Sequence, residues 1–292
     1  MWILLAVFSA LSLGFYDISK KLSLQGNNVL KVLFLNTLFC SLLMSPIILF
    51  GMWNGSFGLG NSLYNHGFIF LKAIIVLASW ICGYYSIKYL PLTIASPISA
   101  SRPVMVLAGA VLIFGERLNL MQWAGVILGF VSLFLISRVG KREGSMANGG
   151  KWVWLAIAAA IFGAISALYD KYLMGHFEPL EVQAWYNLYQ LILMGGVLIV
   201  MMQGAPATEQ PLKWRWSILL ISLFLTAADL AYFYALSIPG SMVAVVSMIR
   251  RGSVLVSFFF GVIALHEKDV RAKLLDLGIL LLGLVLLIIG SN

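Results

Sequence analysis

The sequence predicts an all-α integral membrane protein with ten transmembrane helices, arranged as two inverted five-helix repeats. Composition, ten apolar segments and an internal duplication lead to this prediction. Of the 292 residues, 61% are apolar or aromatic and 10% are Asp, Glu, Lys or Arg, whereas a soluble domain has about 25% charged residues. Because a membrane helix needs ~20 mostly apolar residues, ten helices leave only short connections. This composition excludes a soluble fold and a large extramembrane domain.

The ten segments emerge in order from a window of ~19 residues. They cover residues 2–19, 32–51, 68–88, 93–114, 119–138, 152–171, 181–202, 216–236, 241–265 and 273–290. Turn-forming residues such as Pro91 and Gly240 separate them,. The least regular connection, 138–151, falls at mid-chain, so we expect one repeat in 1–145 and a second in 146–292. The fourth segment contains Pro97 and Pro103, which predict a bend,.

Unusual residues recur between the two halves at a nearly constant offset. The matched pairs are Asp17 and Asp170, Asn36 and Asn187, Ser99 and Ser247, Arg102 and Arg250, and Glu116 and Glu267, with offsets from 148 to 153. Because each half has an odd number of spans, the second half enters the membrane from the opposite side. This inverted plan is typical of secondary transporters, which bind substrate near the bilayer midplane where the repeats meet.

Basic residues in the connections predict the orientation. The connections after spans one, three, five, seven and nine hold thirteen Lys and Arg residues, whereas the opposite face holds Arg117 and Lys171. Since cytoplasmic loops are enriched in Lys and Arg, both termini are expected outside and the mid-chain linker in the cytoplasm. We expect the protein in the plasma (inner) membrane of a bacterium or archaeon.

Arginines in the middle of spans four and nine are the strongest candidates for substrate binding. Charges at this depth are costly and usually functional. Arg102 and Arg250 occupy matching depths, and Arg251 is expected on another side of the same helix as Arg250,. Asp229 in span eight is the candidate charge partner, for example of Arg251, and a possible coupling group. Asp17 and Asp170 are expected near helix ends, so the three arginines face one deep carboxylate and favour an anionic ligand.

Polar and aromatic side chains supply further candidates. Gln183, Asn187 and Gln190 recur at i, i+4 and i+7 on span seven, and Asn36 repeats the feature on span two,. Substrate contact and hydrogen bonding between helices explain this face equally well, with a slight preference for the cavity. Ser99 and Ser247 precede the arginines by three residues. Trp80 and Tyr84 lie one helical turn apart and could form a ring-stacking wall, although most aromatic residues here are expected to pack or to anchor interfaces,.

Several classes of site are excluded by the pattern. Cys40 and Cys82 lie in apolar segments with no His or Cys at metal-ligand spacing, so no metal and no cofactor is expected,. The basic residues do not form the stripe of a nucleic-acid-binding protein. No Ser/His pair and no His with carboxylates lies at membrane depth, so we expect no enzyme.

The closing motif of the fourth span in each half carries a family resemblance. Gly115-Glu116-Arg117 and His266-Glu267-Lys268 end these spans, and Glu116 is expected to pair with Arg117. Two such five-span halves resemble the ten-span EamA-type members of the drug/metabolite transporter superfamily. The resemblance implies movement of a small organic solute by alternating access, without ATP hydrolysis. It also extends to the triose-phosphate/phosphate translocators, whose basic residues on spans four and nine correspond to Arg102 and to Arg250-Arg251, with Arg where that group largely has Lys.

The sequence therefore predicts a secondary transporter of a small organic anion, either phosphorylated or carboxylated. The alternative is an exporter of amino acids or related zwitterionic metabolites, in which an arginine holds the carboxylate and Asp229 the amino group. A monomer is expected to suffice for transport, with a dimer as the other arrangement.

Overall fold

Helices make up all the regular structure in the described part of the chain. A computed structural model describes residues 1–24, 27–55, 63–89, 98, 101–139, 150–203, 212–253, 255–256 and 270–291. Its ten helices are α1 (Trp2–Leu24), α2 (Val29–Asn54), α3 (Leu63–Tyr89), α5 (Arg102–Phe114), α6 (Leu120–Val139), α7 (Gly150–Met174), α8 (Pro179–Gln203), α9 (Trp216–Ser237), α10 (Val243–Arg250) and α12 (Val270–Gly290). Each of them overlaps one predicted segment, and the predicted fold class is confirmed.

Most helices extend past their predicted segments, while spans four and nine show shorter ones. The α1 helix, for example, continues five residues beyond position 19. Within span four, α5 begins at Arg102, with Pro103 in its first turn. Proline is tolerated there because the first helical N–H groups have no intrahelical partner. Ser101 Oγ donates a hydrogen bond to the Ile98 carbonyl at 2.6 Å, which satisfies a backbone group at this helix start.

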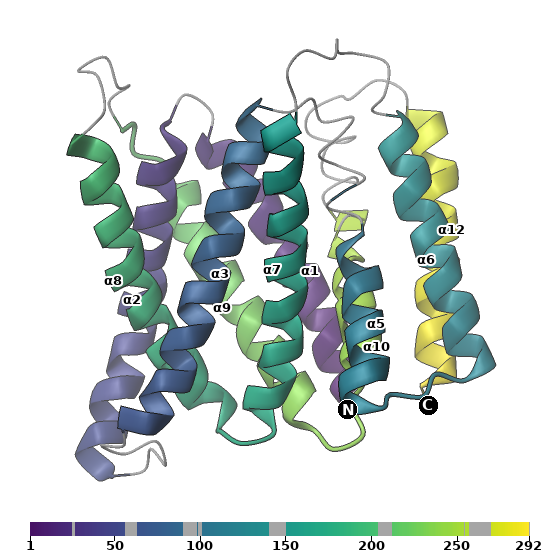
Figure 1. Cartoon of the computed structure of the whole chain (residues 1–292), viewed down its shortest axis with the longest axis horizontal. Coiled ribbons are helices and arrows are strands. Elements are labelled where there is room, and N and C mark those ends of the chain that lie inside the picture. The colour runs from purple at the N-terminus through teal and green to yellow at the C-terminus, as the bar shows by residue number, and fades with distance from the viewer. Residues whose placement is uncertain are drawn as a thin grey trace.

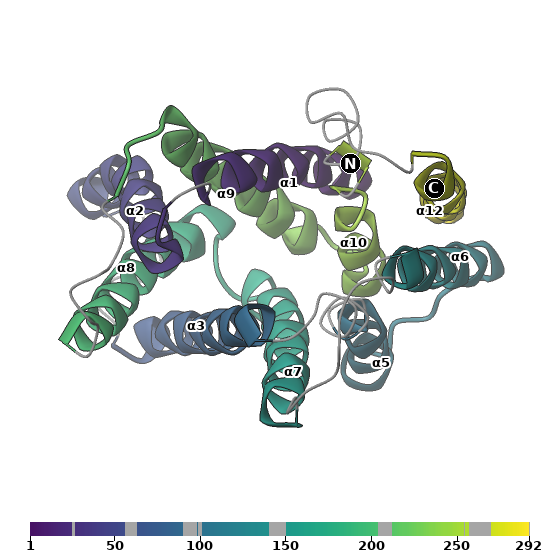
Figure 2. The same cartoon turned by 90° about the horizontal axis from the view of Figure 1, so that it is seen from above.

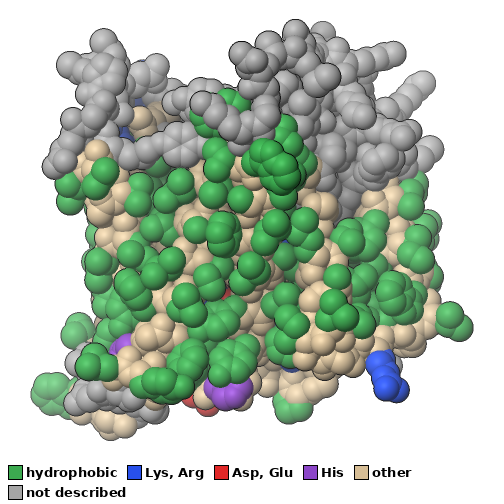
Figure 3. All heavy atoms as spheres, viewed as in Figure 1, with side chains coloured by type: hydrophobic (Ala, Val, Ile, Leu, Met, Phe, Trp, Pro, Cys, Tyr) green, Lys and Arg blue, Asp and Glu red, His purple; other side chains and the backbone are tan. Residues whose placement is uncertain are grey.

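The outer surface suits a lipid environment. Among the described residues, α1, α2, α3, α7 and α9 are long and apolar enough to cross a membrane. Hydrophobic side chains are spread over the described part of the face shown in Figure 3. Charged side chains are sparse across its middle. A soluble protein would expose such a surface to water at a large free-energy cost.

The packing of the helices reflects the duplication. The helix pairs α1–α9 and α3–α7 exchange with each other when the two halves are swapped, and so do α1–α10 and α5–α7. The pairs α2–α8, α5–α10 and α6–α12 each map onto themselves. Figures 1 and 2 show the result, a ring of helices drawn from both halves with α6 and α12 side by side at its edge. Every major interface therefore joins one half to the other.

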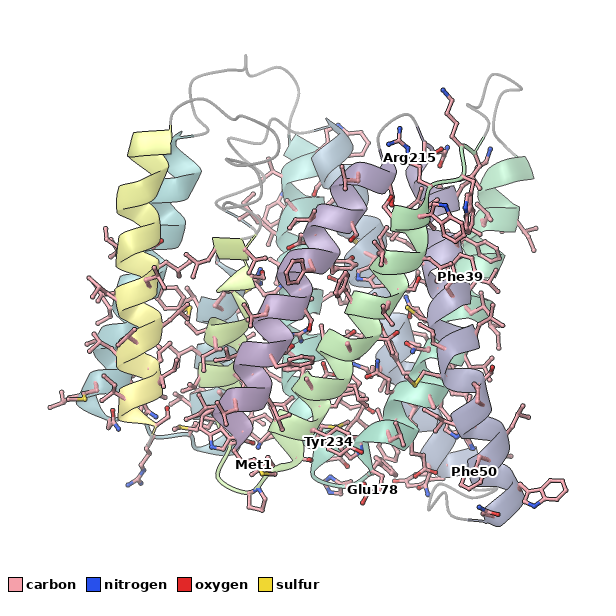
Figure 4. The ribbon with its side chains drawn as sticks, turned by 180° about the vertical axis from the view of Figure 1, so that it is seen from behind. Met1, Phe39, Phe50, Glu178, Arg215 and Tyr234 are labelled. Carbon is pink, nitrogen blue, oxygen red and sulfur yellow. The ribbon has the colours of Figure 1, made fainter. Side chains whose placement is uncertain are left out.

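The two faces of the molecule are marked by labelled residues in Figure 4. Met1 and Glu178 lie at one face, and Arg215 lies at the opposite face. This agrees with an odd number of spans between Met1 and the connection that carries Arg215. The predicted boundary between the repeats, at 145 and 146, lies outside the described residues.

Candidate functional site

A cavity of about 460 Å³ lies where the two halves meet. Residues from α1, α3 and α5 of the first half and from α7, α8, α9 and α10 of the second half line it. Its charged residues are the cations Lys20, Lys72, Arg102, Arg250 and Arg251 and the carboxylates Asp17, Asp170 and Asp229. Among the described residues, the cavity lining thus holds five cationic and three anionic side chains.

Arg102, Arg250 and Arg251, which we call the arginine cluster, come together from spans four and nine. Arg102 is the first residue of α5 and reaches α3 and α7. Its Nη2 donates to Ser79 Oγ at 3.5 Å and to the Ala159 carbonyl at 3.4 Å, both long contacts. Its Nε atom is buried and has no hydrogen-bond partner among the described residues. Arg102 therefore has no carboxylate bonded to it in the described structure.

Arg250 is better compensated than Arg102. Its Nη2 donates to Asp229 Oδ1 at 2.8 Å, and the two side chains are 19% and 21% exposed. Its guanidinium carbon stacks 4.0 Å from the centroid of the Tyr232 ring. The Nε atom is buried without a partner in the described structure. Asp229 is thus a charge partner, but of Arg250, and the suggested pairing with Arg251 is wrong.

Arg251 lies in the same cavity as Arg250. Both residues line it, although successive positions on a helix differ by a turn of ~100°. Arg251 follows the last residue of α10 and keeps helical backbone dihedrals, with φ of −66° and ψ of −17°. The three guanidinium groups lie close enough to repel one another.

A second charged group was missed from the sequence. Lys72 of α3 and Asp170 of α7 form an ion pair whose side chains are 3% and 7% exposed. Lys72 Nζ also lies 4.6 Å from the Tyr186 ring centroid and 4.7 Å from that of Phe233. We call Lys72, Asp170, Tyr186 and Phe233 the paired cluster. A lysine inside an apolar span was the available signal.

The charge balance expected from the sequence is corrected by these contacts. Asp17 and Asp170 were placed near helix ends, but α1 continues to Leu24 and α7 to Met174, and both carboxylates line the cavity. Lys20 and Lys72 line it too. The expectation that three arginines face a single deep carboxylate therefore omitted two cations and two carboxylates. A cationic surplus remains.

The other predicted residues divide into three groups. Trp80 and Ser247 line the cavity. Ser99 lies outside the described residues, as does the side chain of Tyr84, although α3 includes its backbone. Asn36, Gln183, Asn187 and Gln190 are buried, and none of them lines the cavity. Gln183 and Asn36 instead bond to α9, and Asn187 and Gln190 follow Gln183 on the same face of α8.

Glu116 joins the two halves at the face where Met1 lies. It follows Gly115, whose φ of 63° ends α5, and its carboxylate accepts hydrogen bonds from the backbone N–H groups of Val243 at 2.6 Å and Ala244 at 3.2 Å. Glu116 thus caps α10, and the expected pairing with Arg117 is replaced by this contact. Burial raises the pKa of Glu116, and the two N–H groups partly offset that rise.

Comparisons with known proteins agree with this architecture. A crystal structure described only as that of a protein shares the fold, with a TM-score of 0.71 over 98% of this chain and 97% of the other at 16% identity. No curated protein matches the sequence significantly. The family described as "EamA-like transporter family" matches residues 1–138 and 150–289. The chain therefore belongs to the EamA-like transporter family of the drug/metabolite transporter superfamily, and is a membrane transporter of small solutes.

Proposed function

We propose that this protein is a secondary transporter of a small organic anion, phosphorylated or carboxylated, which works by alternating access. The observation that carries the proposal is the arginine cluster. Three guanidinium groups share one directly bonded carboxylate among the described residues, and Arg102 and Arg250 each keep a buried, unpartnered Nε. Like charges this close repel, so an anion between them lowers the free energy of the site.

The donor geometry favours a ligand with two or more oxygen atoms. A guanidinium group presents Nε and Nη donors in a planar fork that matches phosphate or carboxylate. The N-terminus of α5, where Arg102 and Pro103 line the cavity, adds positive potential from the helix dipole,. The volume of about 460 Å³ suits a small metabolite, since ligand sites commonly enclose ~300–1,000 Å³.

A zwitterionic substrate is the second candidate, and the carboxylates support it. Asp17, Asp170 and Asp229 line the same cavity, and any of them could receive an ammonium group. Asp229 and Asp170 are already paired with Arg250 and Lys72. A zwitterion bound to Asp170 or Asp229 would have to displace an existing partner, and Asp17 already interacts with the cations Lys20 and Arg251, so we favour the anion.

Thermal stability of the purified protein in the presence of solutes tests the proposal. A ligand at 100 times its dissociation constant adds about 2.7 kcal/mol. We expect stabilisation by small phosphate esters or dicarboxylates, and a loss of that stabilisation in Arg102→Ala but not in Arg117→Ala, an exposed arginine. Stabilisation by amino acids alone would favour the zwitterion exporter. Equal stabilisation of wild type and Arg102→Ala by anions would overturn the proposed site.

We infer that the face of Arg215 is cytoplasmic and that both termini are outside. The excess of basic residues in that face's connections supports this orientation,. In a background without Cys40 and Cys82, a membrane-impermeant thiol reagent applied to intact cells should label Glu178→Cys and spare Lys213→Cys. The reverse pattern would invert the orientation.

A further inference from the structure

Polar side chains form a second cluster, separate from the residues that line the cavity. The face of α8 with Gln183 and Asn187 contacts α2 and α9, and Gln190 continues this face at i+7 from Gln183. Together with Asn36, Cys40 and Ser41 of α2 and Ser222 and Thr226 of α9, these residues make up what we call the amide seam. The three α8 side chains are between 1% and 7% exposed, and none of them lines the cavity.

Hydrogen bonds across the seam tie all three helices together. Gln183 Nε2 donates to the Thr226 carbonyl at 3.2 Å, and Ser41 Oγ donates to the Asn187 carbonyl at 2.7 Å. Ser222 Oγ lies 3.1 Å from Asn36 Oδ1 and donates to it. The seam is therefore an interface in which each of the three helices is hydrogen-bonded to the other two.

Four amide atoms in the seam have no hydrogen-bond partner among the described residues. They are Gln183 Oε1, Asn187 Nδ2, Gln190 Nε2 and Gln190 Oε1. Burying such groups without partners is unfavourable, and most buried polar atoms in proteins do have partners. An arrangement with four of them along one helix face indicates a ligand that supplies the missing bonds.

The chemistry of these atoms identifies the class of ligand. Two of them are donors and two are acceptors, and no residue of the seam carries a formal charge. A cation would satisfy the acceptors alone, and an anion the donors alone. Water both donates and accepts, and buried waters typically make about three hydrogen bonds to such groups. We propose that the amide seam binds ordered water molecules between α2, α8 and α9, held by Gln183, Asn187 and Gln190.

X-ray radiolytic hydroxyl labelling with mass spectrometry tests this site, because the radicals form from water next to the labelled side chain. Cys40 is the reporter, since it is buried in the seam with its Sγ 3.7 Å from Asn36 Oδ1. Met248 is the dry reference. It is 1% exposed and packs in the apolar core toward Gly129. The full chain in lipid nanodiscs should show labelling of Cys40 well above its background and background labelling of Met248.

Matched variants connect the labelling to the amides. Gln183→Leu with Gln190→Leu should reduce Cys40 labelling at least fivefold. Gln122→Leu should not change it, because Gln122 is an equally buried glutamine of α6 whose amide bonds Asn119 and Ser291. If the double variant does not fold, Gln190→Leu alone and the wild-type labelling of Cys40 still decide the question.

Two results would overturn the proposal. Background labelling of Cys40 in the folded wild-type protein would show that the seam is dry. Labelling of Cys40 that persists in folded amide variants would show that water reaches it without these side chains. Neither result depends on which solute is carried, so the proposed function stands or falls separately.

Discussion

The paired cluster and the arginine cluster share one cavity but differ in how completely their charges are compensated. In the paired cluster, Lys72 has a carboxylate partner and two aromatic rings, and both charged side chains are almost fully buried. In the arginine cluster, Arg250 has one carboxylate at the edge of the cavity. Arg102 has only two long contacts to neutral oxygens.

This difference separates charges that support the fold from charges that are available to a ligand. Breaking a buried ion pair leaves an uncompensated charge and is strongly destabilising. Removing a charge that has no partner leaves no opposite charge uncompensated. We therefore expect replacement of Lys72 to cost the most stability, replacement of Arg250 less, and replacement of Arg102 least. Ligand binding should be most sensitive to replacement of Arg102.

The largest effect on stability is expected for Lys72→Met. Asp170 would keep its charge in a nearly closed site, and such losses cost about 3–5 kcal/mol. Chemical unfolding in mixed micelles should show this decrease, and adding Asp170→Asn should recover much of it. Lys213→Met changes an exposed lysine and is the control. Normal stability combined with loss of uptake would show that the paired cluster acts in transport and does not stabilise the fold.

A smaller destabilisation, about 1–2 kcal/mol, is expected for Arg250→Ala. The pair with Asp229 is one fifth exposed, so cavity water partly solvates the remaining carboxylate. Asp229→Asn should restore stability in the Arg250→Ala background. The matched control is Arg251→Ala, which has no carboxylate hydrogen bond in the described structure and should cost less. A larger loss in Arg251→Ala would show that the observed pairing is not the one that stabilises the protein.

The fold was largely predictable because membrane burial leaves a direct record in the sequence. Apolar length defines each span, and the offset between Arg102 and Arg250 reveals the duplication. The start of α5 at Arg102 and the end of α10 at Arg250 were less accessible. Pro103 indicated one, but nothing in the apolar pattern placed the end of α10 at Arg250.

The site was predictable only in part, because partner choice depends on how helices face each other. The depth of Arg102 and Arg250 followed from residue counting. The identity of the Asp229 partner did not, since a turn of ~100° per residue decides which neighbour reaches it. The polar face on Gln183 was visible in the sequence, but only the packing of α2 and α9 against α8 separates it from the cavity.

Arg102→Ala should affect binding far more than stability. Because no carboxylate loses its partner, the free energy of unfolding should decrease less than in Lys72→Met or Arg250→Ala. The affinity for a stabilising anion should fall at least tenfold, which corresponds to about 1.4 kcal/mol. The anion affinity of Arg102→Lys should lie between those of the wild type and Arg102→Ala, because an ammonium group attracts the anion but lacks the planar fork. Titration calorimetry measures the anion affinity of both variants. Wild-type affinity in Arg102→Ala would show that Arg102 is not part of the binding site.

The smallest effect, and the most selective test of geometry, is expected for Gly163→Ala. A Cβ atom at Gly163 would lie 2.3 Å from Arg102 Cζ, so the guanidinium must move while its charge remains. The fold should tolerate this because the displaced group is the end of a flexible side chain, and alanine favours a helix over glycine by ~0.5–1 kcal/mol. Gly196→Ala is the matched control, since this helical glycine has open space around it. We expect equal or higher stability in both variants and a loss of anion affinity of a few fold in Gly163→Ala alone. Equal affinity in the two variants would mean that the position of Arg102 against α7 is not the one that binds the ligand.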